Sequence, residues 1–170
     1  MVAIVVILAA TVSVFTLGFT DDINQSSPLV GQSTGTLEPN PSGSGSDNGF
    51  VRIRHVAGDT IQTDDMEIVV DATDVCGKRG RLVNLPVDGY SGNAIGSTNI
   101  EGDDIFDGRP PYFRGPEYSA LHETEYVAGK EILFRIPNTD CPVRNGEEVI
   151  VRVVHTPTNS VVIEQTLTAT

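Results

Sequence analysis

The sequence predicts a mainly β protein made of a single N-terminal hydrophobic α-helix, a linker and an antiparallel β-sandwich. Three observations lead to this fold class. Residues 1–19 carry no charge, residues 20–49 are dominated by Gly, Ser, Pro, Asn and Thr, and the remainder alternates short apolar runs with turn residues. Those short runs favour strands, because they lack the period of an amphipathic helix. The predicted segments are residues 1–20, 21–49 and 50–170.

The N-terminal segment is long and apolar enough to form a helix inside a membrane. At about 1.5 Å per residue, residues 1–19 make a helix of roughly 28 Å, close to the bilayer core of about 30 Å. Lipid enforces the helix because every backbone N–H and C=O must be paired within the segment. Three interpretations compete: a cleaved secretory signal, a single-span anchor, and an assembly helix that packs against copies of itself.

We favour the assembly helix. The segment lacks the charged n-region and the A-x-A-like exit of a cleaved signal. Ala9 and Ser13 stand four residues apart, and small residues at this spacing allow neighbouring helices to approach closely. The side chains expected to carry the packing are Val2, Ile4, Val5, Ile7, Leu8, Ala9, Val12, Ser13, Phe15, Leu17 and Phe19.

Residues 21–49 are predicted to be a flexible linker. The stretch is rich in Gly, Ser and Pro and shows no apolar period, which is typical of a tether. Asn24-Gln25-Ser26 matches the N-glycosylation pattern, and a position just outside a membrane would expose it. We therefore expect Asn24 to be a glycosylation site, with a chance match as the alternative.

The β-domain is read from the alternation of apolar and polar residues. Strands are predicted at residues 51–56, 67–71, 81–85 and 131–136, and a hairpin at residues 149–167, whose turn spans residues 156–160. Several short strands without an amphipathic helix favour an immunoglobulin-like antiparallel β-sandwich. Residues 86–118, rich in Gly, Asp and Pro, are predicted to form long surface loops.

Two cysteines, Cys76 and Cys141, each follow a predicted strand. In an extracellular domain such a pair favours a disulfide, and two buried free thiols are the alternative. Two cysteines alone cannot build a structural zinc site, and no ligand-like spacing joins them to a histidine. We expect no metal centre.

The search for catalytic motifs predicts that the chain is not an enzyme and needs no cofactor. Residues 122–125 (HETE) lack the second histidine of a zinc protease helix. Asp103, Asp104 and Asp107 do not follow the EF-hand spacing, so they form either a solvated acidic loop or a cation site. Four arginines on predicted strands are expected to face solvent and pair with carboxylates: Arg52, Arg54, Arg135 and Arg152.

The charge balance limits the partners of the chain. It carries 11 Lys and Arg against 23 Asp and Glu, a net charge of −12. This excludes a nucleic-acid partner, which needs a basic face, and disfavours anionic lipid head groups. Only Lys78 and Lys130 are lysines. An acidic, lysine-poor surface suits a protein in concentrated salt, where self-repulsion is screened, and an ordinary acidic secreted protein is the alternative.

Val2–Phe19 (VAIVVILAATVSVFTLGF) resembles the hydrophobic segment of haloarchaeal type IV pilin precursors, a Val- and Ile-rich helix with a central Ala pair that ends near Leu-Gly. Val51–Ala72 and Val149–Thr168 resemble strands of the same family's β-domain. Precursors of that family carry a charged leader and a prepilin-peptidase site before the helix. The sequence opens on the apolar run, so we expect either that it starts inside a longer precursor or that it is not processed as a pilin.

The resemblance implies a structural role. The chain would be a pilin, held in the membrane before assembly and then polymerised through its helix into a cell-surface filament for adhesion, biofilm formation or cell contact. Its partners would be further copies, the pilus assembly machinery and a prepilin peptidase. The alternative function is a monomeric, membrane-anchored extracellular β-sandwich that binds a ligand.

Overall fold

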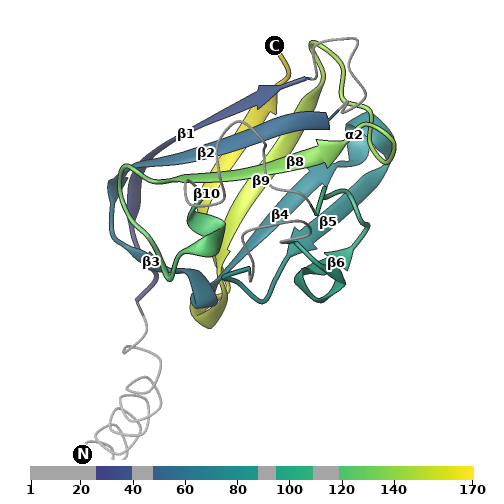
Figure 1. The fold of residues 1–170 in the computed structure, drawn as a ribbon. Coiled ribbons are helices and arrows are strands. Elements are labelled where there is room, and N and C mark those ends of the chain that lie inside the picture. Colours follow the sequence, from purple (N-terminus) through teal and green to yellow (C-terminus); the bar gives the residue numbers. More distant parts are fainter. Residues whose placement is uncertain (1–25, 40–47, 88–94, 109–118) are drawn as a thin grey trace, which may run out of the picture.

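The computed structural model of the chain describes residues 26–39, 48–87, 95–108 and 119–170. These residues form two antiparallel β-sheets that pack face to face, together with a short two-stranded ribbon (Figure 1). The mainly β fold class is therefore confirmed. The predicted helix at residues 1–20 and the glycosylation pattern at Asn24 lie outside the described residues. Within the described ranges, no helix is long and apolar enough to cross a membrane.

The strands and the single-turn helices follow one another closely. The strands are β1 (Val30–Glu38), β2 (Asn48–Gly58), β3 (Ile61–Gln62), β4 (Met66–Ala72), β5 (Lys78–Leu82), β6 (Ile100–Gly102), β7 (Glu125–Tyr126), β8 (Glu131–Pro137), β9 (Glu148–His155) and β10 (Ser160–Thr168). The short helices are η1 (Thr63–Asp65), α2 (Thr73–Cys76), η2 (Ser97–Asn99), η4 (Ala120–His122) and η5 (Thr156–Thr158).

Strand order defines two layers. One sheet has the order β1-β2-β8 and the other has the order β10-β9-β4-β5-β6, while β3 pairs with β7. In Figure 1 the first and last strands, β1 and β10, lie along the same side of the molecule. A parallel bridge between Leu37 and Ala169 joins them. The two sheets are thus linked along that side.

The core lies between the sheets, and strand alternation builds it. On β9 the side chains of Val149, Val151 and Val153 are fully buried, while the residues between them are partly exposed. From the opposite sheet, Val51 and Ile53 of β2 contribute fully buried side chains to the same apolar cluster. Each such side chain stabilises the fold by about 1.5–3 kcal/mol relative to exposure to water.

Most predicted strands are confirmed, with one shift. The hairpin of β9 and β10 forms with its turn at Thr156–Thr158, and β2, β4 and β8 cover the other predicted runs. The strand predicted at residues 81–85 instead occupies Lys78–Leu82. It ends early because Asn84 adopts a positive φ of 53° and Pro86 follows, and neither fits a continuing strand.

The predicted linker at residues 21–49 is wrong over part of its length. Residues 30–38 form β1, which pairs with β2 from Val30 opposite Gly58 to Glu38 opposite Phe50. The Gly- and Ser-rich composition had suggested a tether. In the structure, a Cβ at Gly35 would collide with the end of the Leu167 side chain, so glycine lets β1 pack closely on β10 without moving Leu167.

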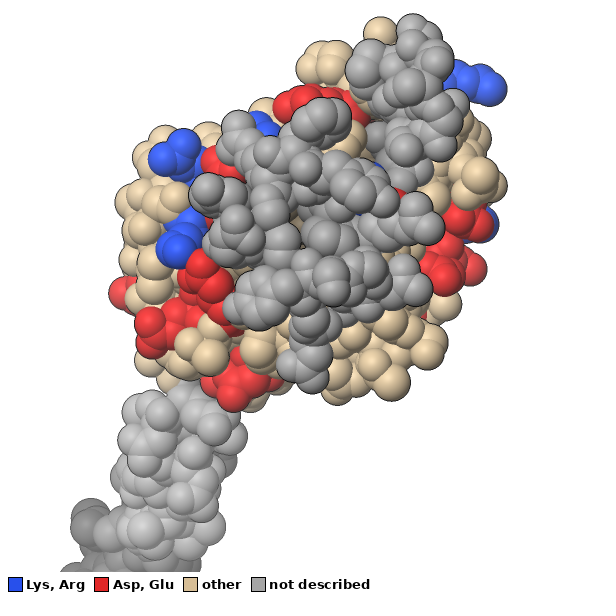
Figure 2. Space-filling model, in the orientation of Figure 1, with Lys and Arg blue, Asp and Glu red and all other residues tan. Residues whose placement is uncertain are grey.

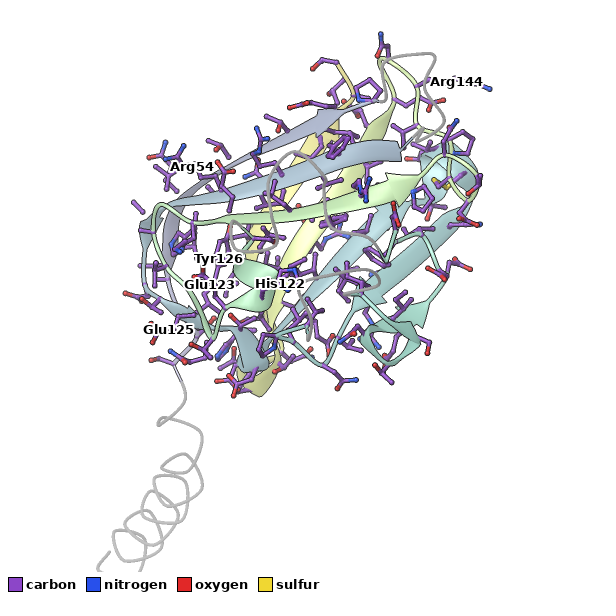
Figure 3. All side chains as sticks on the ribbon, in the orientation of Figure 1. Arg54, His122, Glu123, Glu125, Tyr126 and Arg144 are labelled. Atoms are coloured by element: carbon purple, nitrogen blue, oxygen red, sulfur yellow. A yellow bond between two sulfur atoms is a disulfide. The ribbon has the colours of Figure 1, made fainter. Side chains whose placement is uncertain are left out.

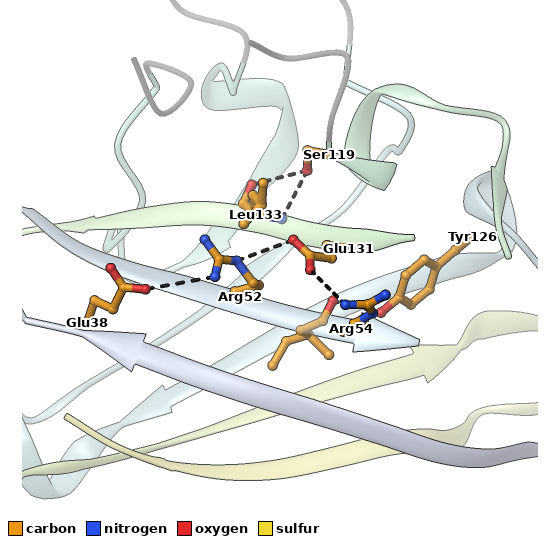
Figure 4. A network of polar contacts seen from close by, with 8 residues as sticks. Glu38, Arg52, Arg54, Ser119, Tyr126, Glu131 and Leu133 are labelled. Atoms are coloured by element: carbon orange, nitrogen blue, oxygen red, sulfur yellow. Dashed lines mark hydrogen bonds and ion pairs between the residues drawn. The ribbon is translucent and has the colours of Figure 1, made fainter. Parts of the chain in front are cut away.

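The outer edge of β8, which pairs with no strand of its own sheet, is covered by contacts from other parts of the chain. The Ser119 hydroxyl accepts a hydrogen bond from the Leu133 backbone N–H (3.0 Å) and donates to the Leu133 carbonyl (3.2 Å) (Figure 4). The Asp107 N–H donates to the Arg135 carbonyl at 2.9 Å. Open strand edges invite pairing with other chains, so these contacts protect the domain against edge-to-edge association.

Candidate functional site

The disulfide between Cys76 and Cys141 is present, which confirms the sequence prediction. Cys76 ends α2, which follows β4 of the five-stranded sheet, and Cys141 follows β8 of the three-stranded sheet. The two Cα atoms lie 5.4 Å apart, and the residues are separated by 65 positions in sequence. The bond therefore ties the end of one sheet to the end of the other.

The acidic loop at residues 103–107 does not gather its carboxylates. Asp103 accepts a hydrogen bond from the Arg79 N–H (2.8 Å), and Asp104 accepts one from the Phe106 N–H (3.4 Å). Asp107 forms an ion pair with a different arginine. Among the described residues, no group of three or more His, Cys, Asp or Glu side chains could hold a metal ion. The carboxylates of this loop therefore serve separate structural contacts.

Residues 122–125 are also divided among separate partners, although Figure 3 shows their labelled side chains near one another. His122 lies on η4 and is half-buried; burial lowers the pKa of its imidazole, and a hydrogen bond to the Val87 backbone partly opposes this. Glu123 accepts from the Lys130 ammonium at 2.7 Å. Glu125 accepts from the Gln62 amide at 3.2 Å. These contacts connect the β7 segment to its neighbours.

The outer face of the three-stranded sheet carries a cross-strand ion network. Arg52 on β2 lies between Glu38 on β1 (3.8 Å) and Glu131 on β8 (3.3 Å) (Figure 4). Glu131 also approaches Arg54 at 3.9 Å. Such pairs across neighbouring strands each contribute up to about 1 kcal/mol. The prediction that Arg52 and Arg54 pair with carboxylates is confirmed.

A row of four charged residues and one valine crosses the five-stranded sheet. The strand register places one residue of each strand side by side, in the order Glu164, Arg152, Val69, Arg81 and Glu101. Arg152 contacts Glu164 at 2.6 Å, and Arg81 forms an ion pair with Glu101. Val69 is only 5% exposed, because the aliphatic stems of its two arginine neighbours can cover it while their charged ends reach solvent.

These contacts share one pattern, in which a single arginine meets carboxylates from the strands on both sides. The described surface contains three such triads: Glu38–Arg52–Glu131, Glu67–Arg81–Glu101 and Asp71–Arg152–Glu164. The second and third triads each keep one excess negative charge, whereas Arg54 balances the first through its ion pair with Glu131. Figure 2 shows acidic side chains next to basic ones on the described surface. The arrangement gives a strongly hydrated surface whose acidic excess is distributed.

Arg135 contradicts the prediction that it faces solvent. Its side chain is 2% exposed, pairs with Asp107 at 3.3 Å, and lies with its guanidinium carbon 5.8 Å from the centre of the Phe50 ring. The reason is tertiary: the chain between β6 and β8 passes along β8 and hydrogen-bonds it through the Asp107 N–H. Strand alternation places Arg135 on the outer face correctly but cannot show that this face is covered.

Tyr126 fastens the β7 segment to the core. Its hydroxyl donates to the Ile53 carbonyl at 2.9 Å, and its ring packs against the ring of His55 at a centroid distance of 5.3 Å. The Nδ1 atom of His55 lies 3.3 Å from the Tyr126 carbonyl oxygen. Burial raises the pKa of the Tyr126 phenol. This fully buried pair therefore holds β7 against β2.

The start of the described chain is fixed to the domain through hydroxyl groups. The Ser27 hydroxyl lies 2.7 Å from that of Ser160, which lies 2.7 Å from that of Thr158. The Thr158 hydroxyl in turn lies 2.7 Å from Nδ1 of His155. The chain of contacts joins the residue at position 27 to the turn between β9 and β10.

A second contact fixes the same segment to the turn after β2. The Leu29 N–H donates to the Asp59 carboxylate at 3.0 Å, and the Asp59 N–H donates to the Leu29 carbonyl at 2.9 Å. Residues 27–29, with these partners, are called the junction below. Sequence reasoning missed the junction, because a serine and a leucine in a Gly- and Ser-rich stretch give no local signal of contacts so distant in sequence.

No protein-family model matches this chain, and no curated protein matches it significantly.

Proposed function

We propose that this chain is a structural subunit of a surface filament of the haloarchaeal type IV pilin kind. In this proposal, residues 1–20 form a helix that packs with the same segment of other copies, and the β-domain forms the outer coat. The filament serves adhesion, biofilm formation or cell contact. The chain acts as a structural element and not as an enzyme.

The junction is the observation that carries the proposal. Ser27 is fixed to the domain, so only residues 20–26 separate the apolar run from the folded part. Even when fully extended, these residues span roughly 28 Å from Phe19 to Ser27. The domain must therefore stay close to the end of the run. This suits a coat packed around a filament core better than a binding module on a long tether.

The strand order supports the finer fold assignment, an immunoglobulin-like sandwich. In that fold one sheet contains the first, second, fifth and fourth strands, and the other contains the third, sixth and seventh, with additions beside the third in the variable type. Here β1, β2 and β8 form the first set, and β4, β9 and β10 form the second, with β5 and β6 added. The disulfide supports an extracellular position, because such bonds persist in oxidising surroundings.

The surface supports a filament coat in concentrated salt. The two triads of the five-stranded sheet, Glu67–Arg81–Glu101 and Asp71–Arg152–Glu164, leave an excess of acidic charge on that sheet. Salt at about 1 M shortens the Debye length to about 3 Å, so neighbouring acidic domains can lie close together. At low salt the same charges repel. Nucleic acid is excluded as a partner in this proposal, because the net charge is −12.

Before assembly, in this proposal, the apolar run holds the subunit in the membrane with its domain outside the cell. The partners are then a prepilin peptidase, the pilus assembly machinery and further copies of the chain. An uncharged run suits both environments, since it is stable in lipid and among other apolar helices.

The proposal is tested by a charge in the run. An aspartate near the centre of a lipid-embedded helix costs about 2.5–3.5 kcal/mol. In Ile7→Asp we expect cells without filaments in electron micrographs, whereas the control Ile7→Leu assembles like the unaltered chain. Filaments that persist in Ile7→Asp would contradict the proposal. Absence of filaments from the unaltered chain, with soluble or membrane-bound monomers instead, would favour the ligand-binding module.

A further inference from the structure

Two large apolar side chains are exposed at the junction end of the domain. Leu29 is 75% exposed and Val161 is 51% exposed, and they directly precede Val30 and Val162. Val30 and Val162 are partly buried and pack against the core. Leu29 and Val161 are therefore exposed although the residue that follows each of them packs on the core.

These two residues belong to chain segments that run alongside each other. Ser33 of β1 receives a hydrogen bond from the side chain of Gln165 of β10, 132 residues away, and the Leu37–Ala169 bridge has the same separation. The Ser27–Ser160 contact continues this parallel alignment with a separation of 133. Leu29 and Val161 lie two residues and one residue from that contact, so both belong to the same end of the domain. We call Leu29 and Val161 the apolar pair.

The backbone under the apolar pair is held in place. Both the N–H and the carbonyl of Leu29 are bonded to Asp59, and Ser27 and Ser160 fix the segments on either side. A leucine on a loose segment could turn inward to escape water. Here the hydrogen bonds fix the backbone at Leu29, so less backbone entropy is lost when a partner covers this side chain.

We propose that the apolar pair is the contact site for the apolar run, residues 1–19, of a second copy of this chain. The inference rests on the proposed function and adds a specific interface to it. Residues 1–25 join the domain at Ser26, three residues before Leu29. Every copy therefore brings an uncharged run to this end of its domain, and copies packed through their runs bring those of neighbours there too.

A second copy fits better than the other occupants. The chain's own run would cover two side chains while leaving most of its length in water, whereas a run packed among several copies is covered on all sides. An anionic membrane surface is disfavoured, because the domain is acidic and Asp59 adjoins the pair. An uncharged helix carries no charge to oppose that carboxylate.

The proposal is tested by cross-linking between copies in assembled filaments. One copy carries Leu29→Cys and an affinity tag, and the other carries Val5→Cys, Val12→Cys or Phe19→Cys without a tag. The two native cysteines are bonded to each other, so the introduced thiols react selectively with a short bismaleimide. We expect cross-linked dimers with at least one of the three run positions. The matched control is Val56→Cys, whose side chain is 37% exposed on the outer face of β2.

The outcomes separate this proposal from the proposed function. Filaments that form but give no more dimers with Leu29→Cys than with Val56→Cys would overturn the contact site and leave the filament proposal intact. A cross-link within one chain only, seen in a copy carrying both Leu29→Cys and Phe19→Cys, would make the chain's own run the occupant and also overturn it. Absence of filaments from the unaltered chain would contradict both the proposed function and the contact site.

A second readout uses polar substitution. In the double variant Leu29→Ser with Val161→Thr, we expect filament yield at limiting subunit concentration to fall about tenfold, as loss of buried apolar area at each contact predicts. The folded domain should keep its thermal midpoint, since both side chains are exposed. Val56→Ser should leave filament yield unchanged. An equal yield in the double variant would contradict the contact site.

Discussion

The hydroxyl oxygens of Ser27 and Ser160 lie 2.7 Å apart although the residues are separated by 133 positions in sequence. One residue directly follows the N-terminal segment, and the other begins the last strand. The contact means that the folded domain starts at position 27, well before the first predicted strand. It also ties the first described residues to the start of the last strand.

Loss of the Ser160 hydroxyl should loosen the junction. Ser160→Ala removes the hydroxyl that contacts both Ser27 and Thr158. We expect the free energy of unfolding to fall by about 1–2 kcal/mol, the net value of one or two hydrogen bonds, and amide exchange at residues 27–30 to rise. Urea titration and hydrogen exchange provide the measurements. Ser160→Thr keeps the hydroxyl and should restore protection. Unchanged exchange in Ser160→Ala would show that the Ser160 hydroxyl does not hold the junction.

Removal of the disulfide should weaken the domain without changing its fold. In the double variant Cys76→Ser with Cys141→Ser, the unfolded chain regains the freedom that a closed loop of about 65 residues denies it. The chain-entropy model gives a loss of about 4 kcal/mol. Urea unfolding of the variant and of the oxidised parent gives the difference. A loss below about 1 kcal/mol would show that the bond adds little to the contacts between the sheets.

Two arginines on the outer face of the same sheet should behave differently. Arg135 is buried beside Asp107, whereas Arg54 is exposed beside Glu131. Removing one partner of a buried ion pair typically costs about 3–5 kcal/mol, and removing an exposed one costs below about 1 kcal/mol. We therefore expect Arg135→Ala to lower the free energy of unfolding several times more than Arg54→Ala. Equal effects in urea titrations would argue against the buried pair.

Acid should destabilise the domain partly through His122. Burial holds the pKa of His122 below its ordinary value of 6.5, so the unfolded chain binds the proton more readily than the folded chain does. The contribution of the neutral ring to stability is therefore fully present above pH 6.5 and is lost as the pH falls below that value. His122→Asn should lose less stability between about pH 7 and about pH 5 than the parent. Parallel pH profiles of the two chains would contradict this account.

The sequence predicts those strands whose burial pattern is strong. In β9 valines alternate with residues of the outer face, and the hairpin with β10 follows from the apolar runs and the turn residues between them. The strand β1 could not be predicted in this way. Glycine at position 35 leaves room for the Leu167 side chain, which a Cβ there would displace, and glycine otherwise signals a loop. A strand that packs through glycine on its inner face therefore has the composition of a flexible linker.

The candidate site was less predictable for a related reason. The two cysteines could be paired from composition and compartment, because no other cysteine is present in the chain. The burial of Arg135 depends on a chain segment that crosses its face, and the junction depends on hydroxyls that meet only in the folded state. Local periodicity carries no information about such contacts, which are set by tertiary structure.

The central claim is that the uncharged run remains part of the mature subunit and holds copies together. Intact-mass analysis of the protein in sheared, sedimented surface filaments tests it most directly. The account predicts a subunit mass that includes residues 1–19, with any leader removed and with the disulfide intact. A mature chain in the filament fraction that begins after Phe19 would contradict it.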